Sequence, residues 1–282
     1  MNDPVGVGVD NIDIPEATKC GVMVMNTPDG NTISTAQLAM SLLCNMARKI
    51  PTANISVKQG KWIPKNFQGV ELQGKTIGII GCGRIGQVVA KLSKTMEMRV
   101  VGYDPMMSPE QLSELGIAGV SLENLLKTSD FITIHTPMTK DTKNLFNDLT
   151  FASCKKGVGI VNCARGGIID EEALLRALES GQVGSAALDV YTSEPPKENL
   201  KSLLQHPNLV CTPHLGASTE EAQINVARDI AQQMCDVFDQ KEVGTHVSLI
   251  SLTHDPLVRW NRQCAIHFHL YTALHETIHV FS

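Results

Sequence analysis

The sequence lacks the patterns that mark several large classes of protein. Its 282 residues contain no apolar run near the ~20 residues that cross a bilayer. The N-terminus has neither a basic segment nor a long apolar one, so we expect no secretory signal. The eight cysteines form no C-x-x-C pair, and the formal net charge is −5. These features argue against a membrane protein, a disulfide scaffold and a general nucleic-acid binder, and they favour a reduced protein of the cytoplasm.

What the chain does contain is a regular alternation of apolar runs and amphipathic stretches. A largely helical region is expected at 32–60, with Ile33, Leu38, Leu42, Leu43 and Met46 on its apolar face. A last helix is expected at 218–239, opened by a capping box of Ser218 and Glu221. Such alternation predicts an α/β fold, a Rossmann-type doubly wound parallel sheet. Strands are expected at 5–9, 22–25, 77–80, 99–103, 131–135, 158–162, 185–189 and 209–212, and further helices at 84–95, 121–128 and 171–180.

A glycine-rich segment follows the strand expected at 77–80. Gly81 permits a tight turn, Gly83 lets the backbone approach a pyrophosphate, and Gly86 lets helix and strand pack closely. The helix that follows presents free N–H groups and a partial positive charge to the anion. Asp104 lies 18 positions after Gly86, where a carboxylate can bind ribose hydroxyls and repel a 2′-phosphate. The segment predicts a site for NAD rather than NADP; the alternative is a glycine-rich turn in another doubly wound protein.

Polar side chains recur where the expected strands end. Because the carboxyl ends of parallel strands share one edge of the sheet, these residues should border one site. They are Asp104, Thr136, Asn162, Asp189 and Thr212.

Three ionisable residues follow strand ends and suit one reaction. Arg165, in N-C-A-R-G-G, can clamp a carboxylate with two parallel hydrogen bonds. His214, in T-P-H-L-G, can move a proton near neutral pH, and Glu194 can bond its other ring nitrogen. Alone, the arginine would be read as a surface residue and the histidine as a hydrogen-bonded loop residue. Together they fit oxidation of a 2-hydroxy acid, with the cofactor taking the hydride.

These motifs resemble the D-isomer-specific 2-hydroxyacid dehydrogenases, and within that family the branch that acts on phosphoglycerate. The resemblance covers roughly residues 6 to 240. N-C-A-R-G-G and H-L-G-A-S-T are its most specific segments. The other matching segments are V-G-V-D-N-I-D, V-M-N-T-P-D-G-N, G-K-T-I-G-I-I-G-C-G-R-I-G, H-T-P, A-L-D-V-Y-T-S-E-P-P and the run from K-K-G-V-G-I-V-N through the arginine motif to I-I-D-E.

The resemblance implies roles for individual residues. Arg165 would bind substrate, Glu194 would support the histidine, and His214 would donate the proton in the reducing direction. The implied reaction is NAD-dependent oxidation of 3-phospho-D-glycerate to 3-phosphohydroxypyruvate by hydride transfer, the first step of L-serine biosynthesis. A homodimer or homotetramer is implied, with the region around 32–50 in the dimer interface. Neither nucleic acid, membrane nor metal is an expected partner. The implied cofactor contacts are Gly81, Gly83, Arg84, Ile85, Gly86, Asp104, Thr136, Pro137, Cys163, Ala164, Arg165, Asp189, His214, Leu215, Gly216 and Ala217.

The chain also departs from the family pattern. The family's first segment is absent, and Val7 stands where a threonine usually touches the cofactor, while Pro4 replaces a common arginine. We therefore expect an incomplete flavodoxin-like substrate domain beside a complete cofactor domain. The expected division is a substrate-domain remnant at 1–28, the NAD-binding Rossmann domain at 29–213, a returning helix at 214–245 and a divergent tail at 246–282.

Other interpretations stay open. The chain could be a glyoxylate or hydroxypyruvate reductase, or a catalytically weak truncated isoform that binds NAD or a partner. The pattern H-E-T-I-H at His275–His279 fits a zinc protease, but no third ligand follows it, so a chance match is preferred. Cys82 and Cys163 are interpreted as packing residues, and Lys155 with Lys156 as a solvated turn.

Overall fold

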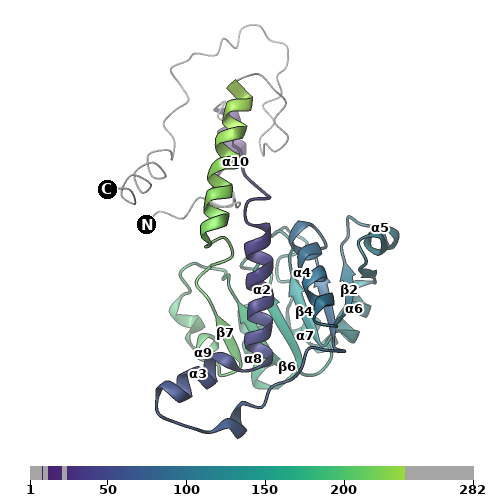
Figure 1. Ribbon diagram of the computed structural model, residues 1–282, viewed down its shortest axis with the longest axis vertical. Helices are drawn as coiled ribbons and strands as arrows, with labels where there is room; N and C mark the ends of the chain where they lie inside the picture. Colours follow the sequence, from purple (N-terminus) through teal and green to yellow (C-terminus); the bar gives the residue numbers. More distant parts are fainter. Residues whose placement is uncertain (1–7, 9–11, 21–23, 239–282) are drawn as a thin grey trace. The chain divides into compact units, whose positions relative to one another are not determined.

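Seven parallel strands form one sheet in the order β3-β2-β1-β4-β5-β6-β7 (Figure 1). The order reverses between β1 and β4: β1, which precedes the glycine-rich turn, pairs in parallel with β2 on one side and with β4 on the other. Such a reversal is where doubly wound sheets bind ligands. The computed structural model describes Gly8, residues 12–20 and residues 24–238. The strands are β1 (Thr76–Ile80), β2 (Arg99–Tyr103), β3 (Ala118–Gly119), β4 (Phe131–Ile134), β5 (Val158–Asn162), β6 (Val183–Leu188) and β7 (Leu209–Cys211).

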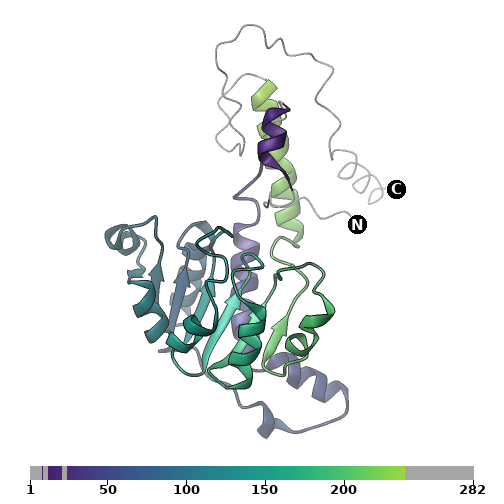
Figure 2. The ribbon, with the colours of Figure 1, turned by 180° about the vertical axis from the view of Figure 1, so that it is seen from behind.

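Helices cover both faces of the sheet (Figures 1 and 2). On one face lie α2 (Thr32–Ala47) and α4 (Arg84–Thr95), and on the other lie α6 (Leu122–Thr128), α7 (Asp148–Ser153) and α8 (Glu171–Glu179). This arrangement confirms the predicted Rossmann-type α/β fold. The remaining elements are α1 (Ile14–Lys19), α3 (Ile50–Lys58), η1 (Pro64–Phe67), α5 (Pro109–Glu114), η2 (Glu198–Leu200), α9 (Lys201–Leu204) and α10 (Glu220–Phe238).

Strand alternation divides the core into two layers. In β1, Ile77 and Ile79 join the cluster under α2 and α4, whereas Ile80 joins the cluster under α6 to α8. Gly78 faces the second layer, where an added Cβ would lie 2.6 Å from a Leu125 side-chain carbon. The missing side chain therefore lets α6 pack directly on the strand.

The region expected to be largely helical at 32–60 is two helices. Pro51 has no N–H to donate to the carbonyl of Ala47, and Val70 N donates to that oxygen instead, at 2.9 Å. Lys49 adopts a left-handed conformation between the helices, with φ of 51°. Ile33 was wrongly placed on the buried face, because it is 57% exposed, while Leu42, Leu43 and Met46 are buried as predicted.

Other elements correct or extend the sequence-based predictions. The capping residue of α10 is Thr219 rather than Ser218, since its hydroxyl accepts from Ala222 N at 3.2 Å. Helix α5 was missed although Ser108, Pro109 and Gln111 form a capping box at its start. Helix α7 and the two-residue β3 were missed as well.

The chain divides into two compact units, one of residues 28–227 and one of residues 1–27 with 228–282. The sheet and all of the catalytic candidates lie in the first unit. No helix among the described residues is long and apolar enough to span a membrane. Several sequence-based predictions lie wholly or partly outside the described residues: the strands at 5–9 and 22–25, Pro4, Val7 and the pattern at 275–279.

Candidate active site

The glycine turn between β1 and α4 is built for close approach. Gly81 has a φ of +86°, and its N–H donates to Tyr103 O at 2.9 Å. A Cβ on Gly86 would lie 2.2 Å from Gly81 O, whereas one on Gly83 would meet nothing within 4 Å. The space in front of Gly83 is therefore open, and α4 begins there with no side-chain cap on its N–H groups. An anion can approach these donors.

Asp104 directly follows β2 and closes the same turn. Its carboxylate oxygens accept from Cys82 N and Met106 N, each at 2.9 Å. Each carboxylate oxygen has a second lone pair, so the group retains capacity for ribose hydroxyls. A carboxylate fixed here would also repel a 2′-phosphate, which stays a prediction from the sequence.

A hollow of about 290 Å³ lies beside Asp104. Its walls are largely apolar. Sequence reasoning missed this hollow because its residues come from separate parts of the chain: β2 and the loop after it, α5, and the end of β3 with the residues that follow. They are Tyr103, Met107, Pro109, Leu112, Gly119, Val120 and Ser121.

The turn that carries Arg165 is held from two sides. The Asn162 side chain donates to Arg165 O at 3.0 Å and accepts from Ala164 N at 3.0 Å. A Cβ on Gly166 would lie 1.8 Å from Tyr191 O, so only glycine permits this approach. The guanidinium donates to Ala164 O at 2.8 Å. The turn therefore sits against the segment that leads to Glu194.

His214 and Glu194 lie in direct contact, as the sequence predicted for this pair. Nδ1 of His214 lies 2.6 Å from Oε2 of Glu194, and the side chains are 49% and 38% exposed. Glu194 Oε1 also accepts from Tyr191 N at 3.1 Å, which fixes the carboxylate. With Nδ1 directed at the carboxylate, Nε2 is the ring nitrogen that can exchange a proton with a substrate.

The loop around His214 is anchored on Asp189, which is fully buried. Its Oδ1 accepts from Thr212 Oγ1 at 2.5 Å and Leu215 N at 2.8 Å, and its Oδ2 accepts from Gly216 N at 3.0 Å. Its carbonyl accepts from His214 N at 2.9 Å. Both carboxylate oxygens of this predicted cofactor contact therefore bind the loop itself.

Two residues of α2 that sequence reasoning missed hold the same loop. The hydroxyls of Ser34 and Thr35 donate to Gly216 O at 2.8 and 3.0 Å. Both side chains are buried in the first turn of the helix. Hydroxyl residues at a helix start usually signal a cap, so nothing local in the sequence points to a partner 182 positions away.

Backbone contacts bring the strand ends together. Asp189 N donates to Asn162 O at 3.0 Å, which joins the arginine turn to the histidine loop. A Cβ on Gly81 would lie 2.5 Å from His135 O and 3.0 Å from Thr136 N, which places the glycine turn against the H-T-P segment. The predicted catalytic and cofactor residues thus come from strand ends that are neighbours in the sheet.

Three titratable groups with shifted pKa values lie beside these turns. Burial lowers the pKa of His135 to about 4, and its Nε2 lies 2.8 Å from Thr133 Oγ1. Burial, and then the charge of Asp104, raises the pKa of the Cys82 thiol to about 12. Cys163 is buried too, and its pKa is raised. The thiols are therefore uncharged at neutral pH, which agrees with their interpretation as packing residues.

Comparison with known proteins identifies the family. Residues 40–216 match the model of the D-isomer specific 2-hydroxyacid dehydrogenase, NAD binding domain. The chain is 52% identical over 248 residues to D-3-phosphoglycerate dehydrogenase of Rattus norvegicus, covering 88% of this chain and 46% of the relative. It is 48% identical over 254 residues to that of Bacillus subtilis, covering 90% of this chain and 48% of the relative. The chain thus spans about half the length of the curated relatives it matches.

Solved structures agree with the sequence relatives. A glyoxylate reductase from Paecilomyes thermophila is 34% identical with a TM-score of 0.80, covering 86% of this chain and 73% of that chain. D-lactate dehydrogenase from Aquifex aeolicus, complexed with NAD and lactic acid, is 28% identical with a TM-score of 0.78, covering 86% of this chain and 78% of that chain. This chain belongs to the D-isomer-specific 2-hydroxyacid dehydrogenase family, with NAD as its cofactor.

Proposed function

We propose that this chain oxidises 3-phospho-D-glycerate to 3-phosphohydroxypyruvate with NAD, the first step of L-serine biosynthesis. The observation that carries the proposal is the His214–Glu194 pair at 2.6 Å, on a loop joined through Asp189 to the Arg165 turn. The substrate is inferred from the 52% identity to a D-3-phosphoglycerate dehydrogenase. The geometry supports the chemistry, and the relatives support the choice of acid.

The cofactor would lie along the carboxyl edge of the sheet. Its pyrophosphate would face the open space at Gly83 and the start of α4, and its adenosine would lie at Asp104 and the adjoining hollow. Thr136, Pro137 and the segments 163–165 and 214–217 would border its other half. When bound, NAD accepts the hydride from C2 of the substrate.

The protein's own groups would bind the acid and move one proton. Arg165 would hold the substrate carboxylate with its guanidinium fork. Nε2 of His214 would take the proton of the C2 hydroxyl as the C2–H bond gives up its hydride. The Glu194 carboxylate would stabilise the imidazolium that forms and keep the ring oriented. In the reverse direction the same imidazolium donates the proton to the substrate oxygen.

NADH formation with 3-phosphoglycerate tests the proposal. We expect turnover, and we expect His214→Gln to lower it by roughly 10²–10⁴-fold, the usual contribution of a general base. His206→Gln is the matched control, because His206 is a histidine outside the site whose Nδ1 accepts from Asn208 N. Absence of turnover by a chain that binds NADH would refute the activity and leave a catalytically weak binding protein.

A second substrate class has a specific observation in its favour. The glyoxylate reductase matches this fold at a TM-score of 0.80 with 34% identity. The assay should therefore be run in the reducing direction with glyoxylate, hydroxypyruvate and 3-phosphohydroxypyruvate. A higher kcat/KM for glyoxylate or hydroxypyruvate than for the phosphorylated acid would assign the chain to that class.

We also propose that the chain pairs with a second copy. The sequence predicted the interface around 32–50, and we propose that it extends through the segment from α3 to η1. This segment projects from the sheet (Figure 1) and carries large apolar side chains that are 42–82% exposed. Exposed apolar patches of this kind mark protein interfaces. We expect Trp62→Ser to shift the oligomer towards monomer in light scattering, while Leu149→Ser, at an equally exposed site on α7, should not. The apolar residues are Ile50, Ile55, Val57, Trp62 and Ile63.

The domain division and location predicted from the sequence remain part of the proposal. We assign 29–213 to the NAD-binding domain, 1–28 and 214–245 to a flavodoxin-like substrate domain, and 246–282 to a divergent tail. A location in the cytoplasm is proposed because the seven cysteines in the described part of the chain are free thiols. Limited proteolysis with mass spectrometry would test the boundaries, and cell fractionation would test the location.

A further inference from the structure

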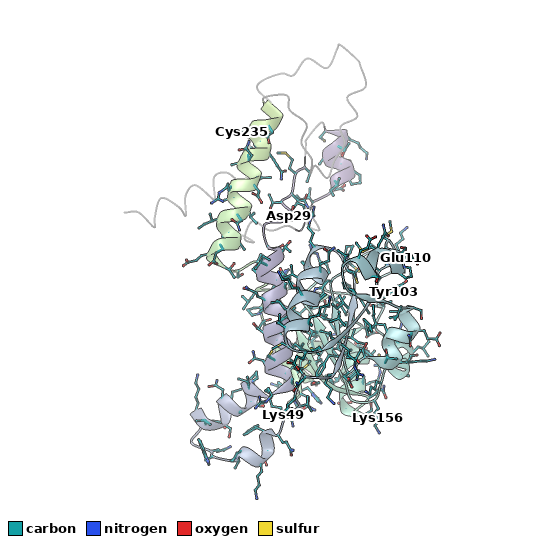
Figure 3. The ribbon with its side chains drawn as sticks, turned by 45° about the vertical axis from the view of Figure 1, so that its right-hand side comes forward. Asp29, Lys49, Tyr103, Glu110, Lys156 and Cys235 are labelled. Carbon is teal, nitrogen blue, oxygen red and sulfur yellow. The ribbon has the colours of Figure 1, made fainter. Side chains whose placement is uncertain are left out.

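An ion pair links the glycine turn to the turn where the chain enters the compact unit of residues 28–227. Arg84 Nε lies 2.6 Å from Asp29 Oδ1, and the side chains are 55% and 64% exposed. Arg84 is the first residue of α4, immediately after Gly83. Figure 3 labels Asp29 in the turn that precedes α2. The pair therefore sits at the mouth of the phosphate site rather than on a remote surface.

The backbone of Asp29 is fixed in this place. Thr32 N donates to Asp29 O at 3.2 Å. A Cβ on Gly30 would lie 2.5 Å from Cγ2 of Val226 and 3.2 Å from its Cα, so the turn packs tightly on the first turns of α10. The backbone of Asp29 therefore cannot move away from the glycine turn without disturbing this packing.

Asp29 and a bound pyrophosphate would compete for the Arg84 side chain. A guanidinium has five N–H donors in a rigid fork, and Asp29 engages the Nε side of that fork. A pyrophosphate in front of Gly83 would attract the same fork. Because one side chain bridges Asp29 to the helix start, the carboxylate lies within about a Debye length, ~10 Å at 0.1 M salt, of that anion. Asp29 would then both hold the cation and repel the ligand.

We propose that Asp29 lowers the affinity of this chain for its dinucleotide by competing with the pyrophosphate for Arg84. The inference rests on the proposed use of NAD and deepens it, by naming a residue outside the glycine motif that sets cofactor affinity. Asp29 touches neither the reacting atoms nor the substrate, so it acts through Arg84.

Asp29→Asn is the direct test, because the amide keeps the shape and the turn preference while removing the charge. NADH binding is measured by fluorescence titration at low and high salt. We expect the Kd for NADH to fall about two- to five-fold at low salt, the range for an exposed charge pair, and the gain to shrink as salt rises. An unchanged or higher Kd would overturn the inference, the latter because Asp29 would then be orienting Arg84 for the phosphate.

Asp148→Asn is the matched control. Asp148 pairs with Arg176 at 2.7 Å, with similar exposure, between α7 and α8. Its loss should leave the Kd for NADH unchanged, and thermal unfolding of both variants checks that each is folded. An equal gain in this control would mean that net charge alone raises affinity, which would overturn the inference.

A cycle with Arg84→Gln separates competition from simple repulsion. If Arg84 breaks its ion pair with Asp29 to bind the phosphates, Asp29→Asn should lower the Kd for NADH less in the Arg84→Gln background than in the unaltered chain. An equal or larger gain in that background would refute the competition. Binding needs no turnover, so failure of the 3-phosphoglycerate assay leaves this test intact; failure of the unaltered chain to bind NADH would overturn both proposals.

Discussion

Replacing the buried Asp189 with asparagine should loosen the loop that carries His214. The carboxylate accepts three hydrogen bonds, from Thr212 Oγ1, Leu215 N and Gly216 N. An asparagine can accept only through its oxygen, and its NH₂ group would face at least one N–H donor. A buried donor without an acceptor costs about 1–3 kcal/mol, so we expect a loss of about 2–3 kcal/mol in the free energy of unfolding.

That loss is a large fraction of a typical domain's ~5–15 kcal/mol. Urea unfolding of the whole chain measures it, and Asp148→Asn serves as the comparison, with an expected loss below about 1 kcal/mol for an exposed pair. Turnover should fall as well, because the loop held by these side-chain bonds carries His214. A free energy of unfolding within about 0.5 kcal/mol of the unaltered chain would refute the claim that these bonds organise the loop.

Three further changes test the packing around the site. Gly166→Ala should remove most turnover and destabilise the fold by about 1–3 kcal/mol in urea unfolding, because the new Cβ would lie 1.8 Å from Tyr191 O; a fully active variant would contradict this packing. Thr35→Val keeps the shape but loses the donor to Gly216 O, so about 1 kcal/mol should be lost in the same assay, and no loss would show that the bond contributes nothing. Burial lowers the pKa of His135 to about 4, so the unfolded chain binds the extra proton first as pH falls; stability from this group should be full above about pH 6.5 and decline towards pH 4 by about 3 kcal/mol. Urea unfolding across this range should show that decline in the unaltered chain, and an unchanged decline in His135→Gln would refute the assignment.

Much of the fold was predictable because its signals are local. The apolar runs and glycines placed the main strands within a few residues, and the alternation with helices specified a parallel sheet. The glycine spacing and Asp104 predicted the dinucleotide turn, because each glycine stands where a side chain would clash with backbone or ligand close to it in the turn. The short β3 and helix α7 were not predicted, because two strand residues or one helical turn give too little periodicity.

The sequence by itself determined which side chains are available for the chemistry: a guanidinium at 165, a carboxylate at 194 and an imidazole at 214. Only the tertiary structure decided that Nδ1 of His214 lies against Glu194. It also decided that both carboxylate oxygens of Asp189 accept hydrogen bonds from the His214 loop, and that Ser34 and Thr35 of α2 bond to Gly216. The physical reason is the sequence separation of the atoms in contact. A turn or cap is set by atoms a few bonds away, whereas these contacts depend on how separate strands and helices pack, which no neighbouring residue encodes.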